Sequence, residues 1–264
     1  MKYLFDWLCD PSVEGVDVDG TDRLSVHRCI LKRKRMLREV FQTFHHDFRT
    51  LDERFLSGEG SRIEVGAGAA PIRDSFPDVL ATDIMENPQL DRVLDAQAMK
   101  LPDSSVRCVY AQNSFHHFSD PERFFAELQR VLIPGGGAIL IEPYYGLLAS
   151  LLFPRMFSTE GFDKNASSWQ VSTTSSMHGA NQALSYLVFV RDREFFETRY
   201  PGLKIAYQQT CNNYLKYLLS GGLNFRQLLP DWMTQFVGLL SLLLSPFNRW
   251  LALHHLIVIK KIST

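Results

Sequence analysis

A glycine-rich turn directly after a short apolar run is the feature that most constrains how this sequence folds. The run Arg62–Val65 has the character of a strand, and Gly66 and Gly68 follow it at once. Glycines at such a turn let the backbone approach a ligand, and the helix expected next offers free N–H groups at its start. A dinucleotide-binding loop is similar, but Pro71 stands where that loop needs its third glycine. The turn predicts a small-molecule site at a strand tip, with a plain tight turn as the alternative.

Short apolar runs alternate with helical stretches between residues 61 and 142. This alternation is typical of an α/β fold with a parallel sheet and crossover helices on both faces. Only seven residues separate Ile84 from Arg92, too few for a crossover helix, and Asn87-Pro88 also discourages one. We therefore expect a turn there. The predicted strands are Arg62–Val65, Val79–Ile84, Arg92–Asp95, Val106–Gln112 and Ala138–Glu142.

A well-marked helix lies between the fourth and fifth of these strands. Ser119 or Asp120 can cap its start, and Pro121 suits its first turn. Glu122 stands three residues after Ser119, as in a capping box. The run Pro134–Gly137 is expected to end the helix, because neither proline nor glycine continues one well. Its buried face is predicted to be Phe124, Phe125, Leu128, Val131 and Leu132.

Residues 24–56 predict one long helix near the N-terminus. Apolar side chains recur there at steps of four and three residues, so they lie on one face that packs on the main domain. A basic cluster between residues 32 and 38 is expected to be a solvated helix face, with contact to anionic lipid as the alternative. We divide the chain into an N-terminal helical cap, residues 1–57, and a larger domain, residues 58–264. The apolar stripe is Leu37, Phe41, Phe44, Phe48, Leu51 and Phe55.

The second half of the chain carries weaker signals. Residues 158–181 are rich in Ser, Thr, Asn and Gly and predict a long loop or lid. A short helix is expected at Asp192–Tyr200. Strands at Leu203–Gln209 and His254–Ile262 are expected to pair at one edge of the sheet. A C-terminal apolar helical insertion, at about residues 212–253, separates these two strands.

The apolar insertion contains Phe236–Leu244, which is apolar on every side. Pro246 and Arg249 interrupt it before it reaches the ~20 residues that a membrane-spanning helix needs. Four interpretations stay open: peripheral membrane contact through residues 232–253, a cover over a lipidic acceptor, a homodimer contact, or a buried hairpin that extends the core.

Composition excludes several classes of function. The formal net charge is −1, so no long-range field gathers nucleic acid, and we expect no nucleic-acid partner. The four cysteines are far apart and form no C-x-x-C pair, which argues against a zinc site or a disulfide scaffold. We therefore expect no metal. Asp6 interrupts any apolar leader, so we expect a cytoplasmic protein, with membrane association as the alternative.

Polar side chains follow the later predicted strands at the same sheet edge. Asp83 ends the second strand fifteen residues after Gly68, where a carboxylate can accept both hydroxyls of a ribose. Asp95 and Ala96 end the third strand, where an acid can accept a hydrogen bond from an adenine amino group. Asn113 follows the fourth strand, so these side chains are expected to share one cleft.

In this order and spacing the motifs resemble the class I S-adenosylmethionine-dependent methyltransferases. The nearest branch is the small-molecule and lipid branch related to ubiquinone-biosynthesis enzymes (methyltransferase type 11-like). The resemblance covers about residues 61–146 and includes the run Leu132–Gly136 before the fifth strand. It implies a Rossmann-like seven-stranded sheet whose last strand runs antiparallel, with S-adenosyl-L-methionine across the strand tips.

Carried over residue by residue, the resemblance implies a cofactor site. The methionine portion would contact Glu64, Gly66 and Gly68, the ribose Asp83, the adenine Asp95 and Ala96, and the amino-acid end Asn113.

Two side chains at neighbouring strand ends suggest a general base. His116 follows the fourth strand and Glu142 ends the fifth, so we expect Glu142 to orient the imidazole that removes an acceptor proton. His117 and His178 are weaker candidates for the base. A role of the histidines in packing or helix capping is the alternative.

We expect O-methylation of a small or lipid-linked acceptor, such as a sugar, a phenol or quinone, or a natural product. Tyr144 and Tyr145 are expected to line the acceptor pocket, and the apolar insertion suits an acceptor with an apolar part. One alternative is a catalytically inactive S-adenosylmethionine-binding or scaffold protein of the same fold. Another is an NAD-dependent dehydrogenase.

Overall fold

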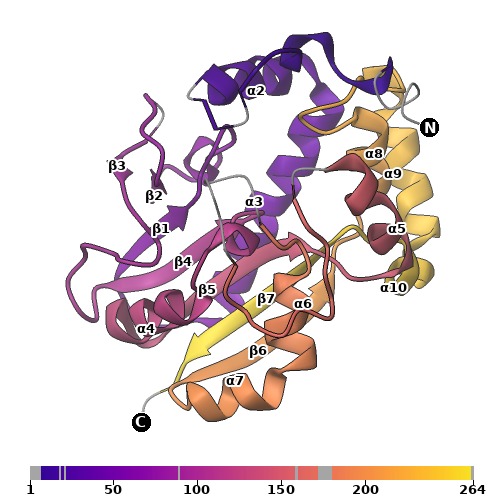
Figure 1. Ribbon diagram of the computed structural model, residues 1–264. Coiled ribbons are helices and arrows are strands. Elements are labelled where there is room, and N and C mark those ends of the chain that lie inside the picture. The colour runs from indigo at the N-terminus through magenta and orange to yellow at the C-terminus, as the bar shows by residue number, and fades with distance from the viewer. Residues whose placement is uncertain are drawn as a thin grey trace.

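A seven-stranded sheet runs through the molecule in the order β3-β2-β1-β4-β5-β7-β6 (Figure 1). The computed structural model describes residues 7–17, 19–20, 22–88, 90–157, 160–171 and 180–262. β7 pairs antiparallel with β5 and β6, and the remaining pairs are parallel. This confirms the sheet that the resemblance implies. The strands are β1 (Ser61–Val65), β2 (Val79–Asp83), β3 (Arg92–Val93), β4 (Val106–Gln112), β5 (Leu132–Pro143), β6 (Leu203–Thr210) and β7 (His254–Lys261).

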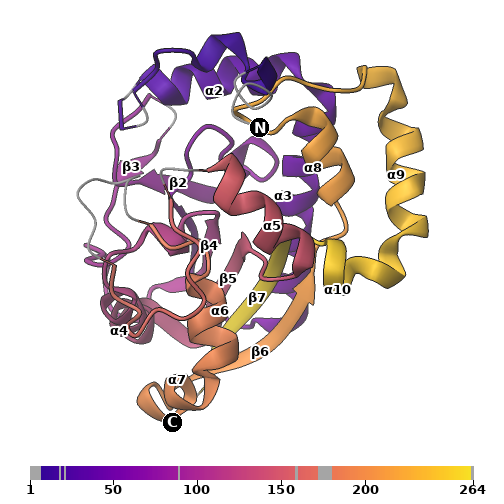
Figure 2. The same cartoon turned by 45° about the vertical axis from the view of Figure 1, so that its right-hand side comes forward.

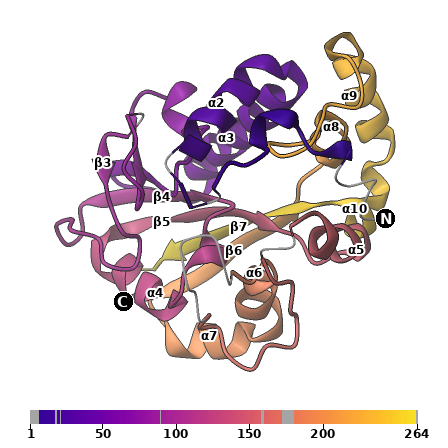
Figure 3. The same cartoon turned by 45° about the horizontal axis from the view of Figure 1, so that its top comes forward.

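Helices cover both faces of this sheet, with α2 and α3 on one side and α4, α6 and α7 on the other (Figure 3). On β4, Val109 and Ala111 pack into one apolar core, while Cys108 and Tyr110 pack into the core under α3. A strand covered on both faces has a continuous apolar run, as β4 has at Cys108–Ala111. The helices are α2 (Asp22–Arg33), α3 (Arg35–Phe55), α4 (Pro121–Val131), α5 (Leu147–Met156), α6 (Leu184–Tyr186), α7 (Arg193–Arg199), α8 (Tyr214–Ser220), α9 (Thr234–Leu243) and α10 (Asn248–Leu251).

Short helical turns connect these elements. No helix links β2 to β3 in the described residues between them, as the short spacing predicted. The helix expected at Asp192–Tyr200 is present as α7, but α6 and a π-helical turn precede it, which the sequence pattern did not indicate. The turns are η1 (Pro11–Val13), η2 (Ile72–Asp74), η3 (Phe115–His117), the π-helix η4 (Leu187–Arg191), η5 (Asp231–Met233) and η6 (Ser245–Phe247).

Helix α4 begins as predicted and ends differently. The Asp120 carboxylate accepts hydrogen bonds from the backbone N–H groups of Glu122 and Arg123, whereas the Ser119 hydroxyl donates to Gln97. The run Pro134–Gly137 does not form a loop after the helix, because β5 begins at Leu132 and includes it. The pairing of β4 with β5 shifts register in this stretch, so the glycines are part of a bulged strand.

The single long helix expected at residues 24–56 is wrong, because Lys34 separates α2 from α3. The side chain of Lys34 is buried, and its ammonium donates to the backbone carbonyls of Gly222 and Phe225. The Asp231 carboxylate accepts hydrogen bonds from the first backbone N–H groups of α3, those of Arg35 and Met36. The basic cluster is therefore not a single solvated face, and it contacts the C-terminal insertion.

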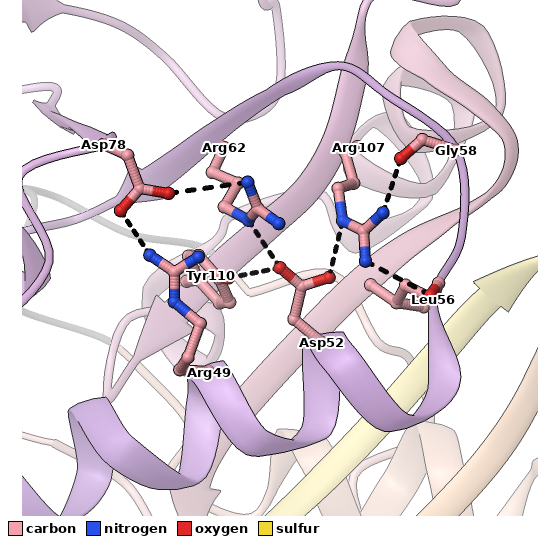
Figure 4. A network of polar contacts seen from close by, with 8 residues as sticks. All are labelled: Arg49, Asp52, Leu56, Gly58, Arg62, Asp78, Arg107 and Tyr110. Carbon is pink, nitrogen blue, oxygen red and sulfur yellow. Dashed lines mark hydrogen bonds and ion pairs between the residues drawn. The ribbon is translucent and has the colours of Figure 1, made fainter.

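Helix α3 is fastened to the sheet by a buried carboxylate (Figure 4). Asp52 accepts hydrogen bonds from Arg62 Nε on β1 at 2.6 Å, and from Arg107 Nε at 2.8 Å and Tyr110 Oη at 2.9 Å on β4. The carboxylate is fully buried, so two guanidinium groups and a hydroxyl replace the water that it loses. This network links one helix to two neighbouring strands. The division of the chain at residue 57 remains a prediction.

The apolar insertion forms α8, α9 and α10, and α9 lies at the outer edge of the molecule (Figure 2). Few residues of α9 are buried, so the interpretation of the insertion as a buried hairpin is wrong for this helix. Among the described residues, none of the helices has the length and apolarity needed to cross a bilayer. The exposed apolar side chains of this region are Trp232, Phe236, Leu239, Leu240, Leu242, Leu243, Phe247 and Trp250.

Candidate active site

A cleft of about 420 Å³ opens where the carboxyl ends of β1, β2 and β4 meet. Parallel strands place the loops that follow them at one edge, so residues distant in sequence gather there. The predicted cofactor residues that line this cleft are Gly66, Gly68, Asp83, Asp95, Ala96 and Asn113. The structure thus brings together in one cavity six of the seven positions that the resemblance implied.

The geometry of the turn after β1 favours glycine at two of its positions. Gly66 has φ +67°, and a Cβ placed there would lie 2.5 Å from the Cβ of Ser114. Gly68 has φ +53°, and its backbone N–H donates to the Asp83 carboxylate at 3.0 Å. Because side chains are excluded at Gly66, the backbone itself forms this wall of the cleft.

Glu64 is the predicted cofactor residue that lies outside the cleft. Its side chain is buried behind the glycine turn, where the carboxylate accepts a hydrogen bond from Ile72 N at 2.8 Å. Burial, together with the nearby Asp83 and Asp74 carboxylates, raises the pKa of Glu64 to about 8, although the hydrogen bond from Ile72 opposes this shift. Glu64 therefore holds the turn in place rather than facing a ligand.

The acidic residues at the strand tips each order a loop and face the cleft. Asp83 also accepts a hydrogen bond from Met85 N at 3.0 Å, and Asp95 accepts one from Gln97 N at 2.8 Å. Asn113 has φ +48°, in the left-handed region that favours glycine or asparagine. Its buried Oδ1 has no hydrogen-bond partner within the described part of the chain, so this oxygen remains an acceptor for a ligand.

His116 and Glu142 meet as the sequence predicts. His116 Nδ1 lies 2.6 Å from Glu142 Oε2, and both side chains are buried. Glu142 also accepts hydrogen bonds from the backbone N–H groups of Ser114 and Phe115, at 3.0 and 2.9 Å. These contacts fix the carboxylate under η3, so that it fixes the orientation of the imidazole.

A second carboxylate that sequence reasoning missed faces the other nitrogen of this imidazole. Glu160 Oε2 lies 3.4 Å from His116 Nε2 and accepts a hydrogen bond from Gln182 Nε2 at 2.6 Å. Burial disfavours a charged His116, but Glu142 and Glu160 outweigh it and raise the pKa of His116 to about 10. Burial likewise opposes ionisation of Glu160, yet His116 lowers its pKa to about 2. Nothing in the sequence signals a role for Glu160, because the polar stretch 158–181 that contains it has no motif.

The structure does not bring Tyr144 and Tyr145 to the cleft. The Tyr144 backbone N–H donates to Leu253 O at 2.7 Å, which ties this segment to the start of β7. The ring centroids of the two tyrosines lie 4.4 Å apart, and both rings also contact His255. The aromatic residues pack on β7 instead of lining a pocket. His178 lies outside the described residues.

Residues from α2 and the segment after α8 close the cleft from above. Arg23 of α2 is half-buried, and its pKa is lowered by burial while Asp83 opposes the shift. His27 lies beside Asn224, and burial, aided by the charge of Arg23, lowers its pKa to about 4. No motif marked these residues, because the helix pattern showed which face is apolar but not what the face covers.

Comparisons with known proteins agree with this architecture. A sequence model of a methyltransferase domain matches residues 64–140, which contain the glycine turn, both strand-tip acids and η3. No curated protein matches the chain.

Several solved structures of methyltransferases resemble the chain at low identity. An S-adenosylmethionine-dependent methyltransferase from Mesorhizobium loti is 15% identical, with 80% of this chain and 96% of that chain covered and a TM-score of 0.44. Phosphoethanolamine N-methyltransferase 2 of Haemonchus contortus is 14% identical, with 83% of this chain and 53% of that chain covered and a TM-score of 0.48. Geranyl diphosphate C-methyltransferase of Streptomyces coelicolor A3(2) is 12% identical, with 97% of this chain and 89% of that chain covered and a TM-score of 0.46. At these identities, the acceptors of those proteins say nothing about the acceptor of this chain.

The strand order, the cleft at the strand tips and the matched domain define an enzyme of the class I methyltransferase fold. Residues 64–140, the part that the domain model matches, form a methyltransferase domain.

Proposed function

We propose that this methyltransferase moves the methyl group of S-adenosylmethionine to a hydroxyl oxygen of a small or lipid-linked acceptor. The observation that carries the proposal is a single cleft lined by the glycine turn, by Asp83 and by His116. One cavity therefore has room for a nucleoside and for an acceptor beside a titratable group. A sugar, a phenol or quinone, or a natural product has the required hydroxyl.

The cofactor end of the cleft matches the groups of an adenosyl methionine. The Asp83 carboxylate suits the ribose hydroxyls, and the loop at Asp95 and Ala96 suits the adenine. The unpaired Oδ1 of Asn113 suits the amino-acid ammonium group, and the guanidinium of Arg23 suits its carboxylate. When bound, the sulfonium supplies an activated methyl group, whose C–S bond breaks with its electron pair left on sulfur.

The acceptor hydroxyl must lose its proton as its oxygen bonds to the methyl carbon. At this end of the cleft, His116 Nε2 faces Glu160 at 3.4 Å, and the Glu142 and Glu160 carboxylates raise the pKa of the imidazole and so favour its protonated form. His116 therefore acts as a base only if the acceptor hydroxyl takes the place of Glu160 at Nε2. Alignment of the reacting atoms supplies the larger share of the acceleration, roughly 7–11 kcal/mol in favourable cases.

An acceptor with an apolar part suits the cleft, because apolar side chains from α5, its C-terminal end and the segment after α8 also line it. These side chains are Phe153, Met156, Phe157 and Leu223.

We also infer that the exposed face of α9 binds a membrane interface. Trp232 before the helix is 80% exposed, and Phe247 and Trp250 after it are exposed as well. The guanidinium of Arg249 lies 4.3 Å above the ring of Trp250, an aromatic and cationic pair that suits lipid headgroups. Arg35, whose side chain is also exposed, adjoins Asp231 and lies next to the start of this face.

Methyl transfer is tested by incubating the enzyme with radiolabelled S-adenosylmethionine and fractionated extract, followed by mass spectrometry of the labelled product. We expect a product with one methyl ether and a His116→Ala variant that binds cofactor normally. Its rate should fall about 10²–10⁴-fold, the usual contribution of a proton-transfer group. Cofactor binding with no labelled product from any fraction would favour the inactive scaffold instead.

A further inference from the structure

Three potential metal ligands lie together at the acceptor end of the cleft. One nitrogen of His116, one nitrogen of His117 and one carboxylate oxygen of Glu160 all lie within 4.8 Å of one another. The histidines are consecutive in η3, and Glu160 comes from the segment after α5. All three side chains line the cleft. The cluster therefore combines ligands from two separate parts of the chain with access to the cavity.

Glu142 orients His116 as outer carboxylates orient metal-binding histidines. Because Nδ1 donates to Glu142 at 2.6 Å, Nε2 is directed toward Glu160 Oε2, 3.4 Å away. Ligand atoms that bind one ion at about 2.0–2.2 Å in tetrahedral geometry lie roughly 3.3–3.6 Å apart. The observed separation matches that spacing, and the 4.8 Å limit for the whole set asks for a small side-chain adjustment.

Glu160 has an orienting partner of its own in Gln182. Gln182 Nε2 donates to Glu160 Oε2 at 2.6 Å, and both side chains line the cleft. Two of the three ligands thus have their own orienting partner, which is the arrangement that metal sites use to fix ligand geometry.

Charge also favours a cation at this position. The rings of His116 and His117 have centroids 4.3 Å apart, and the Glu142 and Glu160 carboxylates lie against the two nitrogens of His116. A divalent ion bound by the two imidazoles and Glu160 balances the charge of both carboxylates.

We propose that His116, His117 and Glu160 bind a divalent transition-metal ion, with a further coordination position open to the cleft. Two histidines and one carboxylate are a ligand set of catalytic zinc sites and of non-haem iron sites that keep open positions. The expectation of no metal rested on cysteine spacing, which this site does not use. The site would explain why an imidazole near the acceptor is enclosed by carboxylates.

The role of the ion, unlike its binding, rests on the proposed methyl transfer. A metal at this position would lower the pKa of an acceptor hydroxyl beside it. The hydroxyl proton would leave to water, an oxygen electron pair would form the bond to the methyl carbon, and the C–S electron pair would stay on sulfur. His116 would then be a ligand, and no free imidazole is needed as the base.

Titration with Co²⁺ tests the site directly. Untagged full-length protein, stripped with a chelator, is titrated with Co²⁺ while its visible absorption is recorded, and Zn²⁺ is then added as a competitor. We expect one saturable equivalent with the spectrum of a histidine-bound ion, displaced by Zn²⁺. His117→Ala and Glu160→Gln should each weaken binding at least 10-fold, and Gln182→Ala about 10–100-fold.

His46→Ala is the matched control, because His46 is an exposed histidine on α3 away from the cleft. It should bind Co²⁺ as the unchanged protein does. Absence of a saturable Co²⁺ spectrum, or equal affinity in folded His117→Ala protein, would overturn the metal site. Should Glu160→Gln fail to fold, His117→Ala still decides. A parallel titration with S-adenosylmethionine separates the two proposals: cofactor binding without metal binding removes only the metal site, and metal binding without cofactor binding removes only the methyl transfer.

Discussion

The Asp83 carboxylate does two things at the tip of β2. It accepts backbone hydrogen bonds from Gly68 and Met85, both at 3.0 Å, and so shapes the loops on either side of the cleft. It also lines the cleft, where its remaining lone pairs are free to accept from a ligand. A single side chain thus joins the structure of the site to its proposed recognition of a ribose.

Replacing Asp83 by Asn should weaken binding of S-adenosylmethionine and of its demethylated product about 10–100-fold, which is roughly 1.4–2.8 kcal/mol. The amide keeps the volume but replaces one acceptor oxygen with a donor. Calorimetric titration measures the change. Asp78→Asn is the matched control, because Asp78 lies at the opposite end of β2, in contact with Arg49 and Arg62. Equal dissociation constants for Asp83→Asn and Asp78→Asn would show that Asp83 is not the ribose ligand.

Glu64 should make stability depend on pH. Its pKa is raised from an ordinary value of 4.5 to about 8, first by burial and then by Asp83 and Asp74, so the folded state holds the proton more tightly than the unfolded state. The stabilisation from this proton is complete below pH ~4.5 and is lost as the pH rises through ~8. Glu64→Gln removes the titration. We expect the stability of the unchanged protein relative to Glu64→Gln to fall by roughly 1–4 kcal/mol from pH ~5 to pH ~8.5. Urea unfolding at both pH values measures this, and a constant difference between the two proteins would contradict it.

At the scale of the elements, α3 depends on the Asp52 network with β1 and β4. Asp52→Ala leaves Arg62, Arg107 and the Tyr110 hydroxyl without their shared partner. We expect a loss of about 3–5 kcal/mol in the free energy of unfolding, because a buried ion pair that loses one partner leaves uncompensated charge. Denaturant unfolding gives the value. Glu53→Ala, at the exposed neighbouring position, should change stability by less than about 0.5 kcal/mol. A loss below ~1 kcal/mol in Asp52→Ala would mean that packing alone holds the helix.

Local signals predicted the elements whose causes are local. The strands and α4 were visible because apolar alternation, the Asp120 cap and the glycine turn all act within a few residues. The break at Lys34 was not visible, since its partners Gly222 and Phe225 lie about 190 positions away.

The candidate site divides in the same way. The strand tips with Asp83, Asp95 and Asn113 followed from the rule that parallel strands end at one edge. Glu160 lies in a stretch without periodicity and reaches His116 through a tertiary contact. Tyr144 does not line the cleft, because its backbone N–H donates a hydrogen bond to Leu253 O beside the start of β7. The local sequence does not encode this contact.

At the scale of the whole molecule, the exposed face of α9 lies apart from the catalytic cleft. Leu239→Asp together with Leu243→Asp should abolish binding to vesicles that contain anionic lipid, because both side chains are exposed on this face. Vesicle flotation measures binding. Phe195→Ser is the matched control, since Phe195 is an exposed apolar residue on α7 and should leave binding unchanged. If the double variant still floats with vesicles, or if the unchanged protein never does, this face does not bind membrane. A concentration-dependent dimer that the double variant loses would instead assign the face to a second copy of the chain.

The central claim is that one cleft at the tips of β1, β2 and β4 binds the adenosyl cofactor. Isothermal titration of the folded protein with S-adenosylmethionine, and then with its demethylated product, tests this claim most directly. The account predicts saturable binding of one equivalent of each, at micromolar to submillimolar concentration. Well-folded protein that shows no heat of binding up to millimolar cofactor would contradict it.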